Sequence, residues 1–536
     1  MTSNAQAHRN AQMVCLQNLQ TGHQQCRAVR RFSNSYDAAT IRRTMIHSAH
    51  SPSIFDSAVT PDFLKRLAAI VGTDRLLSAA DELLVYECDG YVVEKTTPEV
   101  VVFPQSAEEV LGVVRECVAA QVPFVPRGAG TSLAGGCLPV GGGVMIALTR
   151  MSRILEINLR DRYAVVEPGV VNVRLTRALA GSGFHYAPDP SSQGACTIGG
   201  NIATNSGGPH TLKYGVTVNH VLGVEFVSPD GELVQFGGPC GRGNDFDLTG
   251  LFVGSEGTFG VVTKVWVRIT RDPAAHRTML GIFNTVDEAT QAISRIIGAG
   301  IIPAALEMMD QGIVSAVEAA FQFGFPLDAG AVLLIEVDGL DCVVDDEARV
   351  ITDLCMETGA REVRQSKTEE ERLLLWKSRK QAFGAIGRLS PSYCTQDGVV
   401  PRTQLPQILQ FIIEVGQRHG LRIVNVFHAG DGNIHPILLF DERDAEQVRR
   451  VMLASDEILN RCIDLGGSVT GEHGIGVEKI SLMSRLFTAT DLQVMTEIRA
   501  VFNPKQLCSP GKMLPTAGGC GSEQIEKSHP GRRAAM

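Results

Sequence analysis

PRGAGTSLAGG, residues 126–136, is a glycine-rich segment that begins at the last residue of a predicted β-strand at 122–126. A β-branched run at 100–104 predicts an earlier strand. Between the two strands, Ser106 and Glu109 form a predicted capping box that begins a helix with apolar residues at helical spacing. This strand–helix–strand unit places the glycine-rich segment at the carboxyl end of a strand, where open α/β sheets bind ligands. We therefore expect a ligand site at this loop.

The sequence beyond this loop predicts antiparallel sheets. Short alternating runs, including 163–167 and 221–227, indicate strands, and a Pro-Asp-Gly turn at 229–231 closes the second run. From 277 onward the order strand, helix, strand occurs twice, which is typical of an antiparallel sheet with helices on one face. We place a domain boundary near 271, because the pattern changes there.

The length of 536 residues predicts at least two packed domains. We expect domains at 53–271 and 272–515, a disordered or targeting-like N-terminal extension at 1–52, and a disordered tail at 516–536. The extension is rich in arginine and has no acidic residue before Asp37, so it resembles an organellar transit peptide. It lacks apolar helical periodicity, however, which favours a misassigned start and Met45 as the first residue.

The charge and the cysteines exclude several classes of function. A net charge of −9 and a pI near 5.9, with no basic stripe, argue against a nucleic-acid partner. The 13 cysteines are scattered without a Cys-x-x-Cys motif, so we expect reduced thiols in a cytoplasmic protein and no locally held iron–sulfur cluster. No apolar run reaches the ~18 residues of a membrane-spanning helix, so we expect membrane contact only peripherally, through partners.

Three glycine clusters, at 128–136, 199–208 and 254–258, indicate a phosphorylated cofactor. Glycine lets backbone N–H groups approach a pyrophosphate closely, and neighbouring hydroxyl side chains add hydrogen-bond donors. Each cluster alone is more simply interpreted as a tight turn, and none has the Gly-x-Gly-x-x-Gly fingerprint at a strand–helix junction. Their combination in one domain favours a large cofactor.

Two histidines flank a predicted hairpin turn in the C-terminal half. Asp431-Gly432, between two apolar runs, is a strong turn signal. A turn centred on that dipeptide would place His428 and His435 opposite one another, with Cβ atoms ~5 Å apart. Two imidazoles at that separation can share a divalent ion, and Glu472 could supply a carboxylate ligand. The alternative is a pair of hydrogen-bonding or surface histidines.

Five segments of the chain resemble the FAD-binding loops of the vanillyl-alcohol-oxidase-type flavoproteins: PRGAGT (126–131), PDPSS (188–192), TIGGN (197–201), KYG (213–215) and GSEG (254–257). Within that superfamily, residues 54–515 are most similar to the FAD-linked oxidases of the bacterial glycolate oxidase type, and next to D-lactate and D-2-hydroxyglutarate dehydrogenases. The resemblance implies an α+β fold with a two-part FAD-binding domain of the vanillyl-alcohol-oxidase/PCMH type. It also implies a C-terminal cap domain with an antiparallel sheet covered by helices.

The resemblance assigns one set of residues to FAD: Pro126, Arg127, Gly128, Ala129, Gly130, Thr131, Ser132, Pro188, Asp189, Ser191, Thr197, Gly199, Gly200, Asn201, Gly254, Glu256, Gly257 and Val262. Covalent members carry a histidine in the first loop. Thr131 and Ser132 follow Gly130 here, so we expect non-covalent FAD. A departure from the family pattern at Cys508-Ser509 weakens any cofactor role for Ser509.

The resemblance also assigns the catalytic residues. It implies that His428, His435 and Glu472 bind a divalent metal, Zn, Fe or Mn, and that His473 is the general base. Arg379 matches an arginine that binds the substrate carboxylate in relatives, although a solvent-exposed helix face is a comparable interpretation. Lys380 and Arg402 are weaker candidates, and Phe383 replaces an expected polar residue, which favours a small substrate.

The predicted function is oxidation of a small D-2-hydroxy acid, glycolate to glyoxylate or D-lactate to pyruvate, by hydride transfer to flavin N5. Resemblance to glycolate oxidase implies two partners, a second FAD-binding-domain subunit and an iron–sulfur subunit, at the inner face of the membrane. A real transit peptide would instead indicate mitochondria. The alternatives are a stand-alone D-lactate dehydrogenase, a non-catalytic FAD-binding scaffold and a flavin-free zinc hydrolase.

Overall fold

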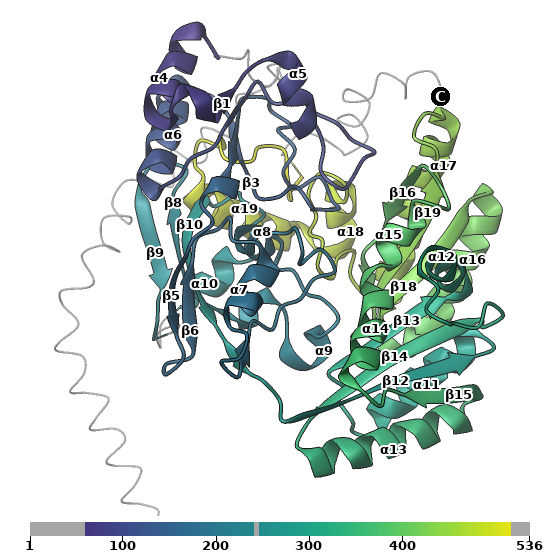
Figure 1. Cartoon of the computed structure of the whole chain (residues 1–536). Coiled ribbons are helices and arrows are strands. Elements are labelled where there is room, and N and C mark those ends of the chain that lie inside the picture. The colour runs from purple at the N-terminus through teal and green to yellow at the C-terminus, as the bar shows by residue number, and fades with distance from the viewer. Residues whose placement is uncertain (1–58, 241–245, 516–536) are drawn as a thin grey trace, which may run out of the picture. The chain divides into compact units, whose positions relative to one another are not determined.

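The computed structural model describes residues 59–240 and 246–515 (Figure 1). The predicted extension at 1–52, including Met45, and the predicted tail at 516–536 lie outside the described residues. Among the described residues, no helix is long and apolar enough to cross a membrane. All ten cysteines in the described ranges are free thiols.

A four-stranded sheet carries the first glycine-rich loop. Its order is β1 (Leu76–Leu77), β2 (Val100–Val102), β4 (Val144–Ala147) and β3 (Phe124–Arg127), and β2, β4 and β3 are parallel. Helix α6 (Ala107–Ala120) joins β2 to β3 and packs with α4 (Pro61–Val71) in the same core. The predicted strand–helix–strand unit is therefore confirmed.

The predicted capping box at the start of α6 is only half formed. Ser106 accepts a hydrogen bond from the Glu109 N–H, as expected. The Glu109 carboxylate accepts from the Gln105 N–H instead of the Ser106 N–H, and it also binds Arg75 at 2.6 Å. The ion pair with Arg75 explains why this carboxylate lies one residue beyond its expected partner.

The second N-terminal sheet is antiparallel, as the alternating runs predicted. Its order is β5 (Ile154–Asn158), β6 (Tyr163–Val166), β10 (Val261–Arg268), β8 (Val221–Val227) and β9 (Leu233–Gly237). Four short helices accompany it: α7 (Asn172–Ala178), α8 (Ile198–Thr204), α9 (Thr211–Tyr214) and α10 (Leu248–Phe252). A two-stranded ribbon of β7 (Phe184–His185) and β11 (Thr270–Arg271) precedes the C-terminal half.

The C-terminal half is built on an eight-stranded antiparallel sheet. Its order is β15 (Ala360–Gln365), β12 (Ala275–Phe283), β14 (Ala331–Gly339), β13 (Ala305–Asp310), β18 (Arg422–His428), β19 (Asn433–Phe440) and β16 (Ser392–Thr395), and β17 (Gly398–Val399) also pairs with β19. Every pairing in this sheet is antiparallel. The prediction of an antiparallel C-terminal sheet is confirmed.

Helices cover both faces of this sheet, so the expectation of helices on one face is wrong. One face packs against α11 (Val286–Gly298), α13 (Asp341–Glu357), α16 (Leu405–His419) and α17 (Ala445–Asp464). The other packs against α12 (Gln311–Phe321), α14 (Glu369–Lys380) and α15 (Ala382–Ile386). The central strands β14 and β19 are buried at nearly every residue, which is the pattern of a sheet covered on both faces.

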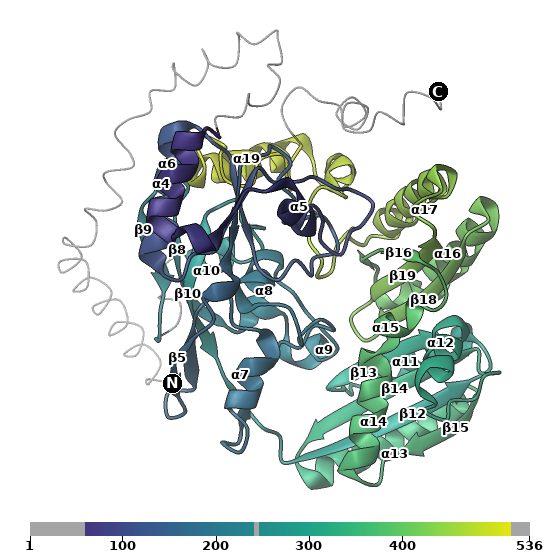
Figure 2. The same cartoon turned by 45° about the horizontal axis from the view of Figure 1, so that its top comes forward.

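The chain returns to the N-terminal half after α17. Helix α19 (Ala489–Phe502) lies beside the N-terminal sheets in both views (Figures 1 and 2). Helix α18 (Met483–Leu486), which precedes it, still packs with Leu459 of α17. Phe502 packs with the core of the antiparallel N-terminal sheet, and Cys508 forms a β-bridge with Phe124 of β3. The last described residues thus pack against the part of the molecule that carries the glycine loops.

A polar contact between the halves explains the KYG segment at 213–215. The Lys213 Nζ donates to the Asp338 backbone oxygen at 2.6 Å and also pairs with the Asp338 carboxylate. The Tyr214 hydroxyl donates to the other carboxylate oxygen of Asp338 at 2.5 Å. These residues join α9 to the end of β14, so the structure gives this segment a role in holding the two halves together.

Candidate active site

A cavity lies between the glycine-rich loops and one face of the C-terminal sheet. Its N-terminal walls are the loop after β3, the first turns of α8 and the segment 255–262. The C-terminal half contributes six residues: Lys380, Phe383, Tyr393, His435, Glu472 and His473. The three predicted glycine clusters and part of the predicted metal site therefore surround the same space.

Most residues predicted to bind FAD line this cavity: Pro126, Arg127, Gly128, Ala129, Gly130, Thr131, Ser132, Ser191, Thr197, Gly199, Gly200, Asn201, Glu256, Gly257 and Val262. A side chain on either of two of the glycines would displace a neighbouring side chain. A Cβ on Gly128 would lie 2.5 Å from the Thr197 Oγ1, and one on Gly130, where φ is +72°, would lie 2.1 Å from the Arg127 guanidinium. The backbone therefore forms the wall at these positions, which fits a cofactor that approaches closely.

Three residues predicted to bind FAD lie outside the cavity lining. The Pro188 backbone oxygen accepts from Asn172. Asp189 pairs with His210 at 2.9 Å, and Gly254, where φ is +87°, donates its N–H to Ile202. Each of the three stabilises the loops around the cavity in this structure.

The β18–β19 hairpin brings His428 and His435 together in a different register from the predicted one. His435 pairs with Val426, and His428 pairs with Asn433. The residues between the paired ends form a four-residue connection, 429–432, instead of a two-residue turn centred on Asp431-Gly432. A shift of two residues leaves both side chains on one face of the sheet. The predicted cross-strand pair is wrong, but the imidazole rings are still only 5.0 Å apart between centroids.

Glu472 completes a three-residue cluster with the two imidazoles. Its Oε1 lies 3.2 Å from the His428 Nε2 and 3.3 Å from the His435 Nε2. The three possible ligand atoms all lie within 4.8 Å of one another. Two imidazole nitrogens and one carboxylate are a common donor set for Zn, Fe or Mn, so the residues present fit a divalent metal.

Acceptors behind the histidines turn both Nε2 atoms towards Glu472, where a metal would bind. The His428 Nδ1 lies 2.8 Å from the buried Glu307 carboxylate, and the His435 Nδ1 lies 3.2 Å from the Gln396 backbone oxygen. An acceptor at Nδ1 keeps the proton on that nitrogen and directs the Nε2 lone pair into the site.

The electrostatics of the cluster favour a positive charge among the carboxylates. Burial disfavours a charged imidazole, but Glu307 and Glu472 outweigh it and hold the pKa of His428 well above its usual range. Burial also opposes ionisation of Glu472, but His428 and His435 hold the pKa of that carboxyl well below its usual range. A proton or a divalent cation can supply the positive charge that this arrangement stabilises.

His473 lies beside the cluster and lines the cavity. Its ring stacks on His435, with centroids 4.9 Å apart and planes 5° from parallel. Burial, and then the neighbouring His435, lower the pKa of His473 to about 4 against the opposing effect of Asp397. The imidazole is therefore neutral near pH 7 and able to accept a proton.

Arg379 is wholly buried in α14, so the alternative of a solvent-exposed helix face is wrong. It does not line the cavity, and its Nη2 lies 2.6 Å from the Glu307 carboxylate behind His428. The adjacent Lys380 does line the cavity, 3.5 Å from the Asp189 carboxylate. Arg402 donates to the Gly430 backbone oxygen in the hairpin connection at 3.1 Å.

The sequence analysis missed three residues that surround the cluster, namely Glu307, Gln396 and Asp397. Each is almost completely buried. Glu307 stands in the apolar strand β13, and a charged residue in a buried strand is itself a signal of a polar partner. The remaining two follow the buried strand β16, and only the fold shows that they lie behind His435.

Comparisons with known proteins identify the family. Residues 98–237 match the family model described as FAD binding domain, and residues 272–513 match FAD linked oxidases, C-terminal domain. The chain is 42% identical to glycolate oxidase subunit GlcD of Escherichia coli K12 over 457 residues, 85% of this chain and 92% of the relative. The chain belongs to the FAD-linked oxidase family. The predicted family, its FAD cofactor and its oxidoreductase class are thereby confirmed, and the alternative of a flavin-free zinc hydrolase is wrong.

Other relatives and solved structures agree with this assignment to the FAD-linked oxidases. Glycolate oxidase subunit GlcD of Bacillus subtilis is 37% identical, covering 85% of this chain and 97% of the relative. The probable mitochondrial D-lactate dehydrogenase of Danio rerio is 31% identical, covering 78% and 84%. The structure of p-cresol methylhydroxylase with substrate bound has a TM-score of 0.72 at 17% identity, covering 84% and 96%, and confirms the predicted fold class.

Proposed function

We propose that this FAD-linked oxidase converts a small D-2-hydroxy acid, glycolate or D-lactate, to the 2-oxo acid at a metal site formed by His428, His435 and Glu472. The observation that carries the proposal is the position of that cluster, which meets the glycine loops and His473 around one cavity. Relatives named as a glycolate oxidase subunit and as D-lactate dehydrogenases support the substrate class.

Three groups of residues divide the chemistry. The glycine loops would hold FAD, which would supply the acceptor for the hydride that leaves the substrate carbon. His428, His435 and Glu472 would hold the divalent cation, whose positive charge would favour ionisation of the substrate hydroxyl. His473 takes the hydroxyl proton, because its imidazole is neutral near pH 7 and lines the cavity. The hydride and the proton together account for the two-electron oxidation.

The walls of the cavity favour a small substrate with one carboxylate. Phe383 and Tyr393 are aromatic and line the C-terminal wall. We assign the substrate carboxylate to Lys380, the cation of this wall, and we assign Arg379 to support of His428 through Glu307. Two aromatic side chains next to a single ammonium group suit glycolate or D-lactate better than a dicarboxylate.

Anaerobic flavin reduction tests the proposal directly. The purified, metal-loaded protein is mixed without oxygen with glycolate, D-lactate, L-lactate or D-2-hydroxyglutarate, and the flavin absorbance is followed. We expect rapid bleaching by glycolate or D-lactate, and little by the other two. A non-catalytic scaffold would show no bleaching with any of these acids, and that outcome would overturn the proposal.

Metal analysis of the same preparation tests the cluster. We expect a chelator to abolish bleaching and added Zn, Mn or Fe to restore it. His435→Ala should lower the bound metal as well as the rate, while the flavin content stays normal. A variant that remains fully active and fully metal-loaded would contradict the proposed coordination.

We also propose that the chain works with a second FAD-binding-domain subunit and an iron–sulfur subunit, at the inner face of the membrane. The word subunit in the names of the glycolate oxidase relatives supports a complex. A stand-alone D-lactate dehydrogenase is the second candidate. If the purified chain alone passes electrons from D-lactate to a soluble dye as fast as the cell extract does, the stand-alone enzyme is favoured.

A further inference from the structure

In the loop that carries Glu472 and His473, consecutive backbone N–H groups donate hydrogen bonds to side-chain oxygens. The N–H groups of Gly471, Glu472 and His473 all donate to one oxygen of Asp397, at 2.9, 3.1 and 2.8 Å. The Gly474 N–H donates to the Thr470 hydroxyl at 2.9 Å. The next two N–H groups along the loop, at 475 and 476, donate to Glu256, both at 2.7 Å. No N–H group between 471 and 476 is left without a side-chain acceptor.

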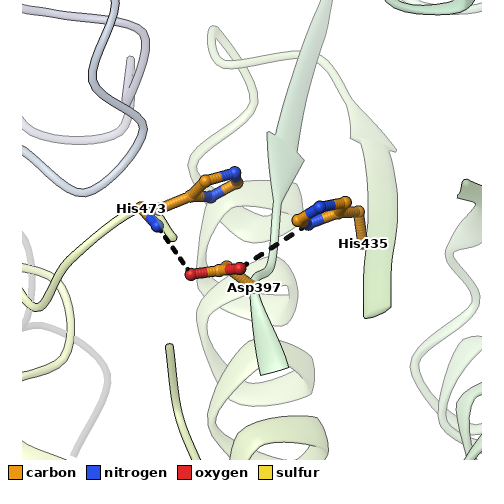
Figure 3. Close-up of side chains that lie close together, drawn as sticks. All are labelled: Asp397, His435 and His473. Atoms are coloured by element: carbon orange, nitrogen blue, oxygen red, sulfur yellow. Dashed lines mark hydrogen bonds and ion pairs between the residues drawn. The ribbon is translucent and has the colours of Figure 1, made fainter. Parts of the chain in front are cut away.

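Asp397 holds the first part of this loop from the C-terminal half. It is completely buried, and its Oδ2 also accepts from the Thr470 hydroxyl at 2.7 Å. Figure 3 shows the carboxylate between His435 and the backbone of His473. Asp397 immediately precedes β17, whose Val399 exchanges two backbone hydrogen bonds with Ser468 just before the loop. Its position is therefore fixed by strand pairing.

Asp397 is better suited to holding the loop than to binding a metal, although it also lies near His435 and His473. Its Oδ2 already accepts four hydrogen bonds. The His435 Nδ1, which faces its Oδ1 at 3.8 Å, is directed at the Gln396 backbone oxygen. The better metal ligands are those of the cluster with Glu472, where both histidines direct Nε2 at the carboxylate.

Glu256 holds the second part of the loop from the N-terminal half. It lies in the GSEG segment that was predicted to bind FAD, and its own backbone has a φ of +50°. Each of its carboxylate oxygens accepts one N–H group, from Ile475 and from Gly476. A Cβ on Gly474 would lie 2.8 Å from the Glu256 carboxylate, so glycine is required for this close approach. Glu256 thus connects a cofactor loop directly to the loop of the proposed base.

We propose that Asp397 and Glu256 are positioning residues, which fix the loop 470–476 so that Glu472 faces the two histidines and His473 faces the cofactor cavity. The inference rests on the proposed function and extends it to residues that are neither the proposed metal ligands nor the proposed base. Glu256 uses both carboxylate oxygens, one for each N–H group, and an amide of the same shape offers only one accepting oxygen. Asp397 uses one oxygen for four hydrogen bonds, which its negative charge strengthens.

Glu256→Gln and Asp397→Asn test the inference, because each keeps the side-chain shape. The first removes one of two accepting oxygens, and the second removes the negative charge that strengthens four hydrogen bonds to one oxygen. Asp310→Asn is the matched control, since Asp310 is a carboxylate that accepts the N–H groups of Ile313 and Asn425, at 3.0 and 2.8 Å, away from this loop. Hydrogen–deuterium exchange on the substrate-free holoenzyme reports the loop without reference to activity. We expect amides 471–476 to exchange about 10- to 100-fold faster in the two variants, the range for losing a bond to a charged acceptor.

Single-turnover flavin reduction then separates positioning from general stability. We expect the rate per bound flavin at saturating substrate to fall about 10²-fold in Glu256→Gln and Asp397→Asn, with normal flavin content in Asp397→Asn and little change in the substrate concentration for half saturation. The control should lose thermal stability comparably and keep its rate. Unchanged loop exchange would overturn the inference, and so would faster exchange without a fall in rate. Failure of the wild-type protein to react with any 2-hydroxy acid would instead refute the proposed function, while the exchange result would stand.

Discussion

At the scale of single residues, the proposed chemistry depends on a neutral imidazole at His473. Burial and His435 keep this side chain uncharged near pH 7, and its backbone, not its ring, is held by Asp397. The ring Nδ1 has no hydrogen-bond partner among the described residues. An imidazole that is fixed through its backbone and by stacking on His435, and whose Nδ1 makes no hydrogen bond, is well placed to exchange a proton with substrate.

His473→Ala should therefore keep FAD and metal but lower the rate of flavin reduction about 10²- to 10⁴-fold, the usual contribution of a general base. Flavin absorbance gives the cofactor content, and anaerobic stopped-flow gives the rate. His419→Ala is a suitable control, because His419 of α16 pairs with Glu457 of α17, away from the cavity. Loss of flavin from His473→Ala would show that this residue supports the cofactor loops instead.

Lys380 and Arg379 have neighbouring positions but different predicted effects. Lys380→Met should raise KM about tenfold or more, because it removes a charge-assisted contact with the substrate carboxylate. Arg379→Met should mainly lower metal affinity, because it leaves Glu307 without its cation behind His428. Steady-state kinetics and metal analysis distinguish the two. If Arg379→Met alone raises KM, the carboxylate belongs to Arg379, as the resemblance to relatives implied.

At the scale of elements, the β18–β19 hairpin decides whether the metal ligands converge. Gly432 has a φ of +82°, and a Cβ there would lie 2.1 Å from the Val400 backbone oxygen. A side chain at this position would push the connection away from its neighbour and strain the backbone.

Gly432→Ala should destabilise the protein by about 1–3 kcal/mol more than Gly466→Ala, because an overpacking contact adds to the same backbone strain. Gly466 is the matched control: its φ is +81°, and a Cβ there would meet nothing within 4 Å. Urea denaturation gives the free energies of unfolding, and metal analysis shows whether the ligands have separated. Equal destabilisation by the two substitutions would contradict the proposed role of the close contact.

The hairpin also shows what local sequence can predict about the site. Apolar runs and a turn signal were sufficient to place His428 and His435 on neighbouring strands of one sheet. The register was wrong by two residues, because the length of the connection depends on contacts with Val400 and Arg402 that are distant in sequence. Both histidines stayed on one face because the error was an even number of residues.

At the scale of the whole molecule, too, local sequence patterns predict the sheets but not the contacts between segments that are distant in sequence. Strand patterns predicted the antiparallel sheets, and the resemblance to FAD-linked oxidases implied the fold. Neither indicated that Cys508 would pair with Phe124, or that Glu256 would hold residues 475 and 476. Such contacts join segments more than 200 residues apart in sequence, so only the assembled structure reveals them.

An ion network between the two halves of the molecule makes its stability depend on pH. His210, in the N-terminal half, lies 2.9 Å from Asp189 and 3.6 Å from Glu336 of β14. Burial disfavours the imidazolium, but these two carboxylates outweigh it and raise the pKa of His210 to about 10. Arg372 and Trp376 of α14 also bind Glu336, so the network extends into the helix that carries Lys380.

A raised pKa in the folded state means that protonated His210 stabilises the folded protein. This stabilisation is complete below the unfolded value of about 6.5 and is lost as the pH rises towards about 10. Wild-type protein should therefore have a higher Tm than His210→Gln at pH 6.5, and the difference should shrink as the pH approaches 10. Calorimetry gives the Tm of both proteins at each pH. Groups that titrate in both proteins affect both Tm values equally, so the difference in Tm reports His210. A difference in Tm that stays constant with pH would mean that His210 supports the contact between the halves by its shape and not by its charge.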